Sequence, residues 1–282
     1  MTQILTFPNV TGTGTTHIGG IARDPHTGFY MILTDPAAAW ATEGADLTGD
    51  HLLIKYNPLT SCTLWTMNLT TVTHEKYGGF QDVETDRRGN TYVVGTFPGT
   101  ILLVDKYGRE IKGWYLPSPF PTPVPGVPFT KRGFGGLAAV PGTNICYDPI
   151  GDHLCKQLGR LIRAAPGERP WRCRCRPGCC IAIPTPFICR LNMAGKVLLV
   201  ASWGLGVQVL RSKKAEKKWE RAEYLGTVAV EYPVDEEFPQ IGPESLYVIL
   251  AFGDFPWVEG AGGRRRFPMP DITREVEALL RK

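Results

Sequence analysis

The chain has 282 residues, and 43% of them are apolar, so it is long enough to bury a sizeable core. It contains no run of about 18 apolar residues, which argues against a transmembrane helix. Its net charge of +4 is concentrated in one segment, because eight basic residues and a single acid lie between positions 156 and 190. A nucleic-acid-binding face needs basic charge spread over a folded surface, so this class of protein is set aside, as is a membrane protein.

The first residues of the chain carry neither the basic region nor the long apolar region of a signal peptide. We therefore expect a cytoplasmic location.

The first repeating unit begins at the glycine pair Gly19-Gly20. Two apolar segments flank the turn Asp24-Pro-His-Thr-Gly28, and two more flank the turn Asn57-Pro-Leu-Thr-Ser61. Turns rich in Asp, Asn, Gly and Pro connect tight hairpins, and the segments between them are rich in strand-forming residues. The pattern predicts four short strands, at 20–24, 29–34, 52–56 and 62–69.

The unit repeats along the chain. A second glycine pair stands at Gly78-Gly79 and a third at Gly135-Gly136, which are intervals of 59 and 57 residues. The second unit again predicts four strands, at 80–85, 92–95, 100–104 and 111–116. Four antiparallel strands that recur at a fixed period are typical of a β-propeller blade. The fold class is therefore predicted to be all-β, a single propeller domain over residues 1–282.

Between about residues 144 and 190 the pattern is lost. Seven of the eight cysteines lie in this stretch, but no C-x2-C pair recurs at the spacing of a zinc finger, which disfavours a zinc site. Our hypothesis is that a frame-shifted or mis-spliced reading frame produces the segment and leaves the ring incomplete. Beyond it, strands are predicted at 197–202, 207–210 and 245–252, and a short helix at 271–282 with Asp271 as its cap.

The repeat also assigns the loops to two faces. In a blade, the loop that enters the innermost strand and the loop between its second and third strands emerge on the same side. Long loops on one side of a scaffold are where binding and catalysis concentrate. We call this side the loop face and the opposite side the turn face. The loop face is predicted to carry residues 11–18, 35–50, 70–77, 96–99, 117–134 and 203–206.

Several stretches resemble a known family. They are His17-Ile-Gly-Gly-Ile, Thr34-Asp-Pro-Ala-Ala-Ala-Trp40, Lys76-Tyr-Gly-Gly-Phe-Gln-Asp-Val-Glu84, Leu198-Leu-Val-Ala-Ser-Trp-Gly204 and Phe267-Pro-Met-Pro-Asp-Ile-Thr273. They are similar to the fungal core trichothecene cluster protein 14 family, over roughly residues 1–143 and 196–282. The resemblance implies a six-bladed propeller that begins here inside its first blade. It also implies a role in mycotoxin biosynthesis, with links to virulence.

The same architecture includes calcium-dependent lactonases and esterases of the gluconolactonase type, which implies a metal-dependent alternative. Such a site would draw Ca²⁺, or another divalent cation, to oxygen ligands from several blades. The candidate ligands are Asp35, Asp82, Glu84 and Glu244, and Asp82 and Glu84 share one face of an innermost strand. The alternative is that these acids cap turns or pair with neighbouring arginines.

The remaining candidates lie on the loop face. The candidate catalytic residues are His17, as a general base, together with Asp82 and Glu84. The alternative for His17 is that it only forms a hydrogen bond with a nearby loop. Trp40, Phe97 and Trp203 are candidates to line an apolar pocket for a terpenoid-like ligand, and otherwise pack between blades. The leading prediction is a secondary-metabolism protein that binds a small, apolar, terpenoid-like metabolite. Chemical transformation of that metabolite is a further part of this hypothesis. A metal-dependent hydrolase and a non-catalytic interaction scaffold remain open.

Overall fold

The computed structural model describes side chains and backbone over most of the first two blades and parts of the third and fourth. The described residues are 5–11, 13, 16–24, 26–36, 38–86, 88–109, 135–138, 196–201, 206–212, 223–230, 246 and 270–281, with the backbone of further strands at 111–115, 139, 145–147, 160–163, 171–172, 186–192, 202 and 222.

These residues form four antiparallel sheets of four strands each, and within each sheet the strands follow chain order. The first blade is β1 (His17–Arg23), β2 (Tyr30–Asp35), β3 (Leu52–Asn57) and β4 (Cys62–Asn68). The second is β5 (Gly78–Thr85), β6 (Thr91–Phe97), β7 (Thr100–Val104) and β8 (Ile111–Tyr115). The third is β9 (Ala138–Ala139), β10 (Ile145–Tyr147), β11 (Arg160–Arg163) and β12 (Trp171–Arg172). The fourth is β13 (Pro186–Asn192), β14 (Val197–Ser202), β15 (Gly206–Ser212) and β16 (Ala222–Val228).

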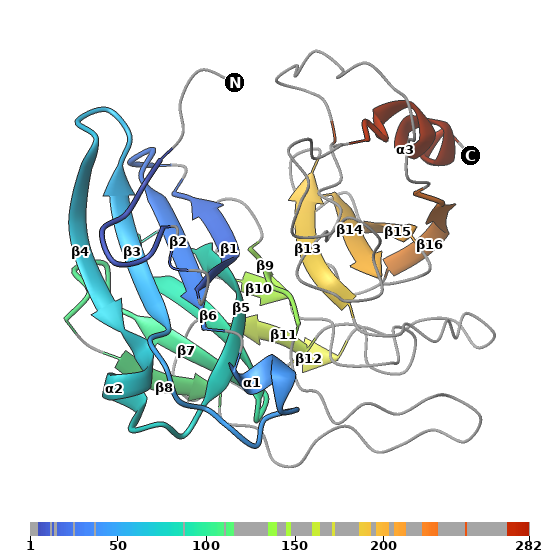
Figure 1. Cartoon of the computed structure of the whole chain (residues 1–282). Coiled ribbons are helices and arrows are strands. Elements are labelled where there is room, and N and C mark those ends of the chain that lie inside the picture. Colours follow the sequence, from blue (N-terminus) through green and yellow to red (C-terminus); the bar gives the residue numbers. More distant parts are fainter. Residues whose placement is uncertain are drawn as a thin grey trace.

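The four sheets are arranged around a common centre, with the first strand of each sheet innermost (Figure 1). Strand β1 contacts β5, β5 contacts β9, and β9 contacts β13, so neighbouring inner strands lie side by side. This is the arrangement of propeller blades. The predicted fold class is confirmed. The predicted count of six blades stays a prediction, since residues 231–245 and 247–269 lie outside the described part of the chain.

The best-described core fills the space between the first two blades. Met31, Leu33 and Leu53 from the first blade meet Phe80 and Val93 from the second, all with no exposed area. Each such side chain contributes about 1.5–3 kcal/mol when it leaves water. Alternate residues of the first blade therefore pack against the second blade, while Ile32, Ile54 and Tyr56 form a separate buried cluster.

The glycine pairs mark where inner strands approach one another. A Cβ atom on Gly20 would lie 2.8 Å from the carbonyl oxygen of Gln81, which only glycine avoids. The β1 ladder is irregular across its glycine pair, between Ile18 and Ile21, and the β5 ladder is irregular just after its pair, between Phe80 and Asp82. The predicted inner strands started too late, at residues 20 and 80, because His17 and Ile18 in β1 and Gly78 in β5 already pair with the neighbouring strand.

The described residues also form three short helices: α1 (Ala38–Ala41), α2 (Leu69–Thr73) and α3 (Thr273–Leu280). Sequence patterns did not predict α1 or α2. Strand β4 ends at Asn68, one residue earlier than predicted, because the Asn68 side chain accepts a hydrogen bond from the backbone N–H of Thr71 and begins α2.

The C-terminal helix is confirmed but shorter than predicted. The predicted cap is wrong, because the N-cap residue is Ile272, which makes no side-chain hydrogen bond to the helix. The Asp271 carboxylate, one residue earlier, accepts a hydrogen bond from the backbone N–H of Thr273. The buried Val276 packs this helix against the fourth blade. No helix in the described part of the chain is both long and apolar enough to cross a membrane.

Candidate functional site

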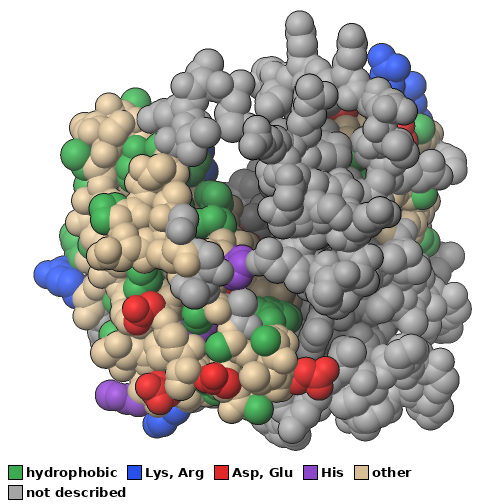
Figure 2. Space-filling view, viewed as in Figure 1, with side chains coloured by type: hydrophobic (Ala, Val, Ile, Leu, Met, Phe, Trp, Pro, Cys, Tyr) green, Lys and Arg blue, Asp and Glu red, His purple; other side chains and the backbone are tan. Residues whose placement is uncertain are grey.

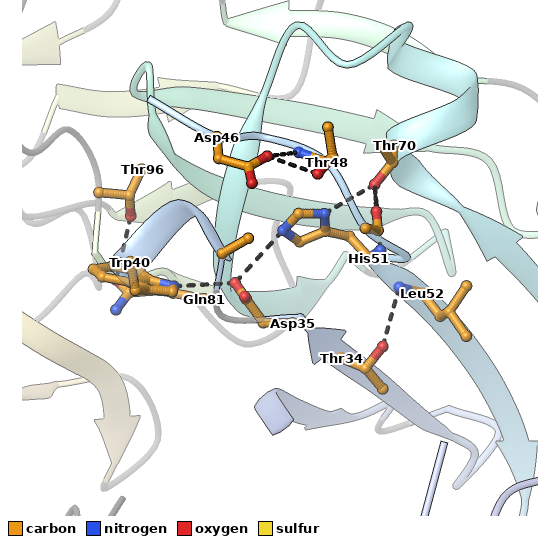
Figure 3. Close-up of polar contacts among 12 residues, drawn as sticks. Thr34, Asp35, Trp40, Asp46, Thr48, His51, Leu52, Thr70, Gln81 and Thr96 are labelled. Atoms are coloured by element: carbon orange, nitrogen blue, oxygen red, sulfur yellow. Dashed lines mark hydrogen bonds and ion pairs between the residues drawn. The ribbon is translucent and has the colours of Figure 1, made fainter. Parts of the chain in front are cut away.

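The loop face of the first two blades brings together several of the predicted site residues. Strand β2 ends at Asp35, whose side chain is almost fully buried. One turn of α1 then places the indole of Trp40 against it, and Trp40 Nε1 donates a hydrogen bond to Asp35 Oδ2 at 3.0 Å (Figure 3). The helix exists because this contact closes the loop back onto the strand that it leaves.

Trp40 also meets Phe97, which ends β6 in the second blade. The two ring centroids are 5.1 Å apart at an interplanar angle of 72°, an edge-to-face contact. Gly79 makes room for this pair, because its φ is +60° and a Cβ atom there would lie 2.6 Å from the Phe97 ring. The predicted aromatic cluster is therefore brought together at Trp40 and Phe97. Trp203 lies outside the described residues.

A polar pair lies beside these rings. Thr96 Oγ1 donates to Gln81 Oε1 at 3.4 Å, and Gln81 is the extra residue of the β5 bulge (Figure 3). Trp40 and Gln81 are both half-buried, so both reach the surface. The arrangement offers a flat apolar ring with an amide next to it.

His51 is the site residue that sequence reasoning missed. It has no exposed area, and its ring packs edge-to-face on Phe80. Its Nδ1 lies 2.9 Å from Thr70 Oγ1, and Thr70 Oγ1 donates to the carbonyl oxygen of Gly49. The network therefore assigns the proton to Nδ1. The sequence feature that could have indicated its burial is its position directly before the apolar strand that begins at Leu52.

The other ring nitrogen of His51 points to Asp35. Nε2 lies 3.7 Å from Asp35 Oδ2, beyond hydrogen-bonding distance, and has no hydrogen-bond partner. Burial lowers the pKa of His51 below its usual 6.5, although the charge of Asp35 opposes that shift. The imidazole is therefore neutral at neutral pH, and Trp40 Nε1 supplies a hydrogen bond to the Asp35 carboxylate.

His17 lies near Asp35 at this site. It stands directly opposite Asp35 in the β1–β2 pair and is half-buried. Opposed residues of an antiparallel pair share a face of the sheet, so both side chains face the same way. A proton-transfer role for His17 stays a prediction.

Asp82 and Glu84 lie elsewhere, on the inner strand β5. The Asp82 carboxylate accepts hydrogen bonds from the backbone N–H groups of Val83 at 2.9 Å and of Leu137 at 3.0 Å. Leu137 leads into the third blade, so Asp82 ties two blades together. Glu84 lies on the same face of β5 as Asp82 and is half-buried.

The predicted metal ligands do not form a cluster in the described residues. No group of three or more His, Cys, Asp or Glu side chains comes together there to hold an ion. Glu244 lies outside the described part of the chain, so the four-ligand set stays a prediction.

Among the described residues, the part of the loop face around α1 is acidic. Acidic side chains gather at the end of the first two blades where α1 and α2 lie (Figure 2). The segment 36–50 contains Glu43, Asp46 and Asp50 but no Lys or Arg. Such a surface disfavours an anionic ligand.

No family model matches the chain. It is 24% identical to "Trichothecene biosynthesis protein 14" of Trichoderma arundinaceum, over 98% of this chain and 77% of that protein. It is 27% identical to "Core trichothecene cluster (CTC) protein 14" of Fusarium sporotrichioides, over 97% and 74%. Among solved structures it is similar to the major Malassezia sympodialis allergen Mala s 1, with a TM-score of 0.68 at 18% identity, over 95% of this chain and 81% of that one.

The resemblance indicated by the sequence motifs is confirmed, and it extends across the segment that the motifs left out. The chain is therefore a β-propeller protein similar, over almost its whole length, to the trichothecene-cluster protein 14 of two fungi.

Proposed function

We propose that the protein binds a small, neutral, terpenoid-like metabolite of fungal secondary metabolism on its loop face, against Trp40. The observation that carries the proposal is the fixed orientation of this indole. Asp35 accepts a hydrogen bond from its N–H and the Phe97 ring packs against it edge-to-face, while Trp40 itself is only half-buried. A ring that is already ordered loses little entropy when a ligand packs on it.

The chemistry around Trp40 fits such a ligand. Terpenoids are apolar frameworks with a few oxygen atoms, and ligand sites of this kind combine apolar walls with a small number of placed polar groups. The Gln81 amide supplies a polar group beside the ring, and the acidic loops disfavour an anion. The relatives named for trichothecene biosynthesis make a trichothecene the first ligand to test.

The test is isothermal titration calorimetry of the whole chain with a trichothecene. We expect saturable binding that Trp40→Ala weakens at least about tenfold, which corresponds to about 1.4 kcal/mol. Tyr107→Ala, which removes an exposed aromatic ring on the turn face, is the matched control and should bind as the wild type does. Equal weakening by both variants, or by neither, would contradict the proposed place of binding.

No observation favours the hydrolase or the scaffold over this proposal. Both oxygens of Asp82 already accept backbone hydrogen bonds, which is the pattern of a structural carboxylate. Calcium-dependent hydrolysis of a simple lactone in the same preparation would instead support the metal-dependent alternative.

A further inference from the structure

The turn face carries a cavity of about 460 Å³ between the first two blades. Its walls come from the turns after β1, β5 and β7 and from side chains of β3 and β4. Small-ligand sites span about 300–1,000 Å³, so the volume suits a one- or two-ring molecule. We call it the turn-face cavity; its lining residues include Phe29, Lys55, Leu64, Trp65, Lys106 and Tyr107.

Lys55 is a buried cation in this cavity. Its residue is 6% exposed, and its Nζ donates a hydrogen bond to the carbonyl oxygen of Lys106 at 3.1 Å. None of the ion pairs formed among the described residues includes it. An ammonium has three donors and is costly to bury without an anion. Burial accordingly lowers the pKa of Lys55 below its usual 10.5.

The two nearby carboxylates accept hydrogen bonds from groups within their own turns. Asp24 accepts hydrogen bonds from the backbone N–H of His26 and from Thr27 Oγ1, at 2.9 and 2.6 Å. Asp105 accepts from the backbone N–H groups of Tyr107 and Arg109. Their charges act on Lys55 from a distance, but neither forms an ion pair with its ammonium.

The walls around this cation are flat and apolar. Lys55 Nζ lies 5.8 Å from the ring centroid of Phe29 and 6.0 Å from that of Trp65. The indole N–H of Trp65 is buried and has no hydrogen-bond partner. Tyr107 forms an exposed wall with the cations Lys106 and Arg109 over its ring. The cavity thus combines aromatic walls, one buried ammonium and a mostly basic rim, with Lys106 and Arg88, that also includes the Asp24 carboxylate.

We infer that the turn-face cavity is a binding site for an aryl carboxylate, with Lys55 holding the carboxylate and Phe29, Trp65 and Tyr107 packing on the ring. A carboxylate supplies the acceptor oxygens that the ammonium lacks, and a flat ring matches the walls. The site is separate from the loop face, where the acidic loops disfavour an anion. The inference can therefore be tested independently of the proposed function.

The test compares 2-naphthoate with its neutral amide, 2-naphthamide, by calorimetry on the whole chain at neutral pH. We expect the acid to bind at least about tenfold more tightly than the amide. In Lys55→Met, which keeps most of the apolar stem, we expect this preference to disappear. Tyr107→Ala should weaken the acid and the amide alike, because it removes a wall and not the charge.

Several results would overturn the inference. These are no saturable binding of the acid, equal binding of acid and amide, or a preference that survives in Lys55→Met. Complete displacement of naphthoate by an equal concentration of inorganic phosphate would also overturn it, since the aromatic walls would then contribute nothing. If Lys55→Met fails to fold, the acid-to-amide ratio of the wild-type chain decides the question.

Discussion

Asp82 Oδ2 accepts a hydrogen bond from the backbone N–H of Leu137 at 3.0 Å, across the boundary between the second and third blades. Both residues are buried, with exposed fractions of 2% and 0%. The carboxylate singled out by its place on an inner strand is thus a link between blades.

Asp82→Ala removes this acceptor and leaves a buried N–H group without a partner. We expect the free energy of unfolding to fall by about 1–3 kcal/mol, measured by urea denaturation. Asp82→Asn keeps one acceptor oxygen and should lose less. An unchanged urea midpoint in Asp82→Ala would show that the link does not contribute to stability.

His51 predicts how stability depends on pH. The pKa of His51 in the folded chain lies below 6.5. At pH values between this folded-state pKa and 6.5, the unfolded chain therefore binds more protons than the folded chain. The free energy of unfolding should therefore fall as pH is lowered from 6.5 to the folded pKa. The difference curve between the wild type and His51→Gln isolates this effect from the other histidines. A wild type that gains stability on acidification would instead indicate an imidazolium–Asp35 ion pair.

Gly79 tests the packing that orients the aromatic pair. Gly79→Ala combines a φ of +60° with a Cβ atom 2.6 Å from Phe97, and we expect it to cost about 2–4 kcal/mol of stability. Gly89→Ala is the matched control, since its φ is +80° but the nearest atom would lie 3.5 Å away. It should cost only about 1 kcal/mol. Equal losses in thermal or urea unfolding would mean that crowding at Phe97 is unimportant.

The hydrogen bond between Asp35 and Trp40 predicts energetic coupling. In a double-mutant cycle of Asp35→Ala and Trp40→Phe, we expect a coupling energy of about 0.5–3 kcal/mol in urea unfolding. The reason is that Trp40→Phe already removes the N–H that Asp35 accepts. Strictly additive effects would show that the indole is oriented by Phe97 alone.

The strands of the first two blades were predictable because their apolar alternation and their turn residues agree. Strand β7 lies at the predicted residues, and β3 extends only one residue beyond its prediction. The helices α1 and α2 were not predictable, because helices of four and five residues depend on tertiary contacts rather than on periodicity. Trp40 needs Asp35 to close α1, and no local pattern encodes that contact.

The candidate site was predictable only in part, for a related reason. Trp40, Phe97, Asp35 and His17 were assigned to one face by counting loops, and the structure brings them to one edge of the first two blades. His51 was missed because its burial follows from packing on Phe80, which is distant in sequence. Lys55 sits in an apolar strand, and only the fold shows that its ammonium lies between two aromatic rings.

The central claim is that a neutral terpenoid-like ligand binds on Trp40. It is tested most directly by the indole N–H signals in a ¹⁵N NMR spectrum, with the Trp40 signal assigned from Trp40→Phe and the Trp65 signal from Trp65→Phe. On titration with a trichothecene, we predict that the Trp40 signal shifts in a saturable way while the Trp65 signal stays in place. A stationary Trp40 signal with saturable movement at Trp65, or no movement at either, would contradict the claim.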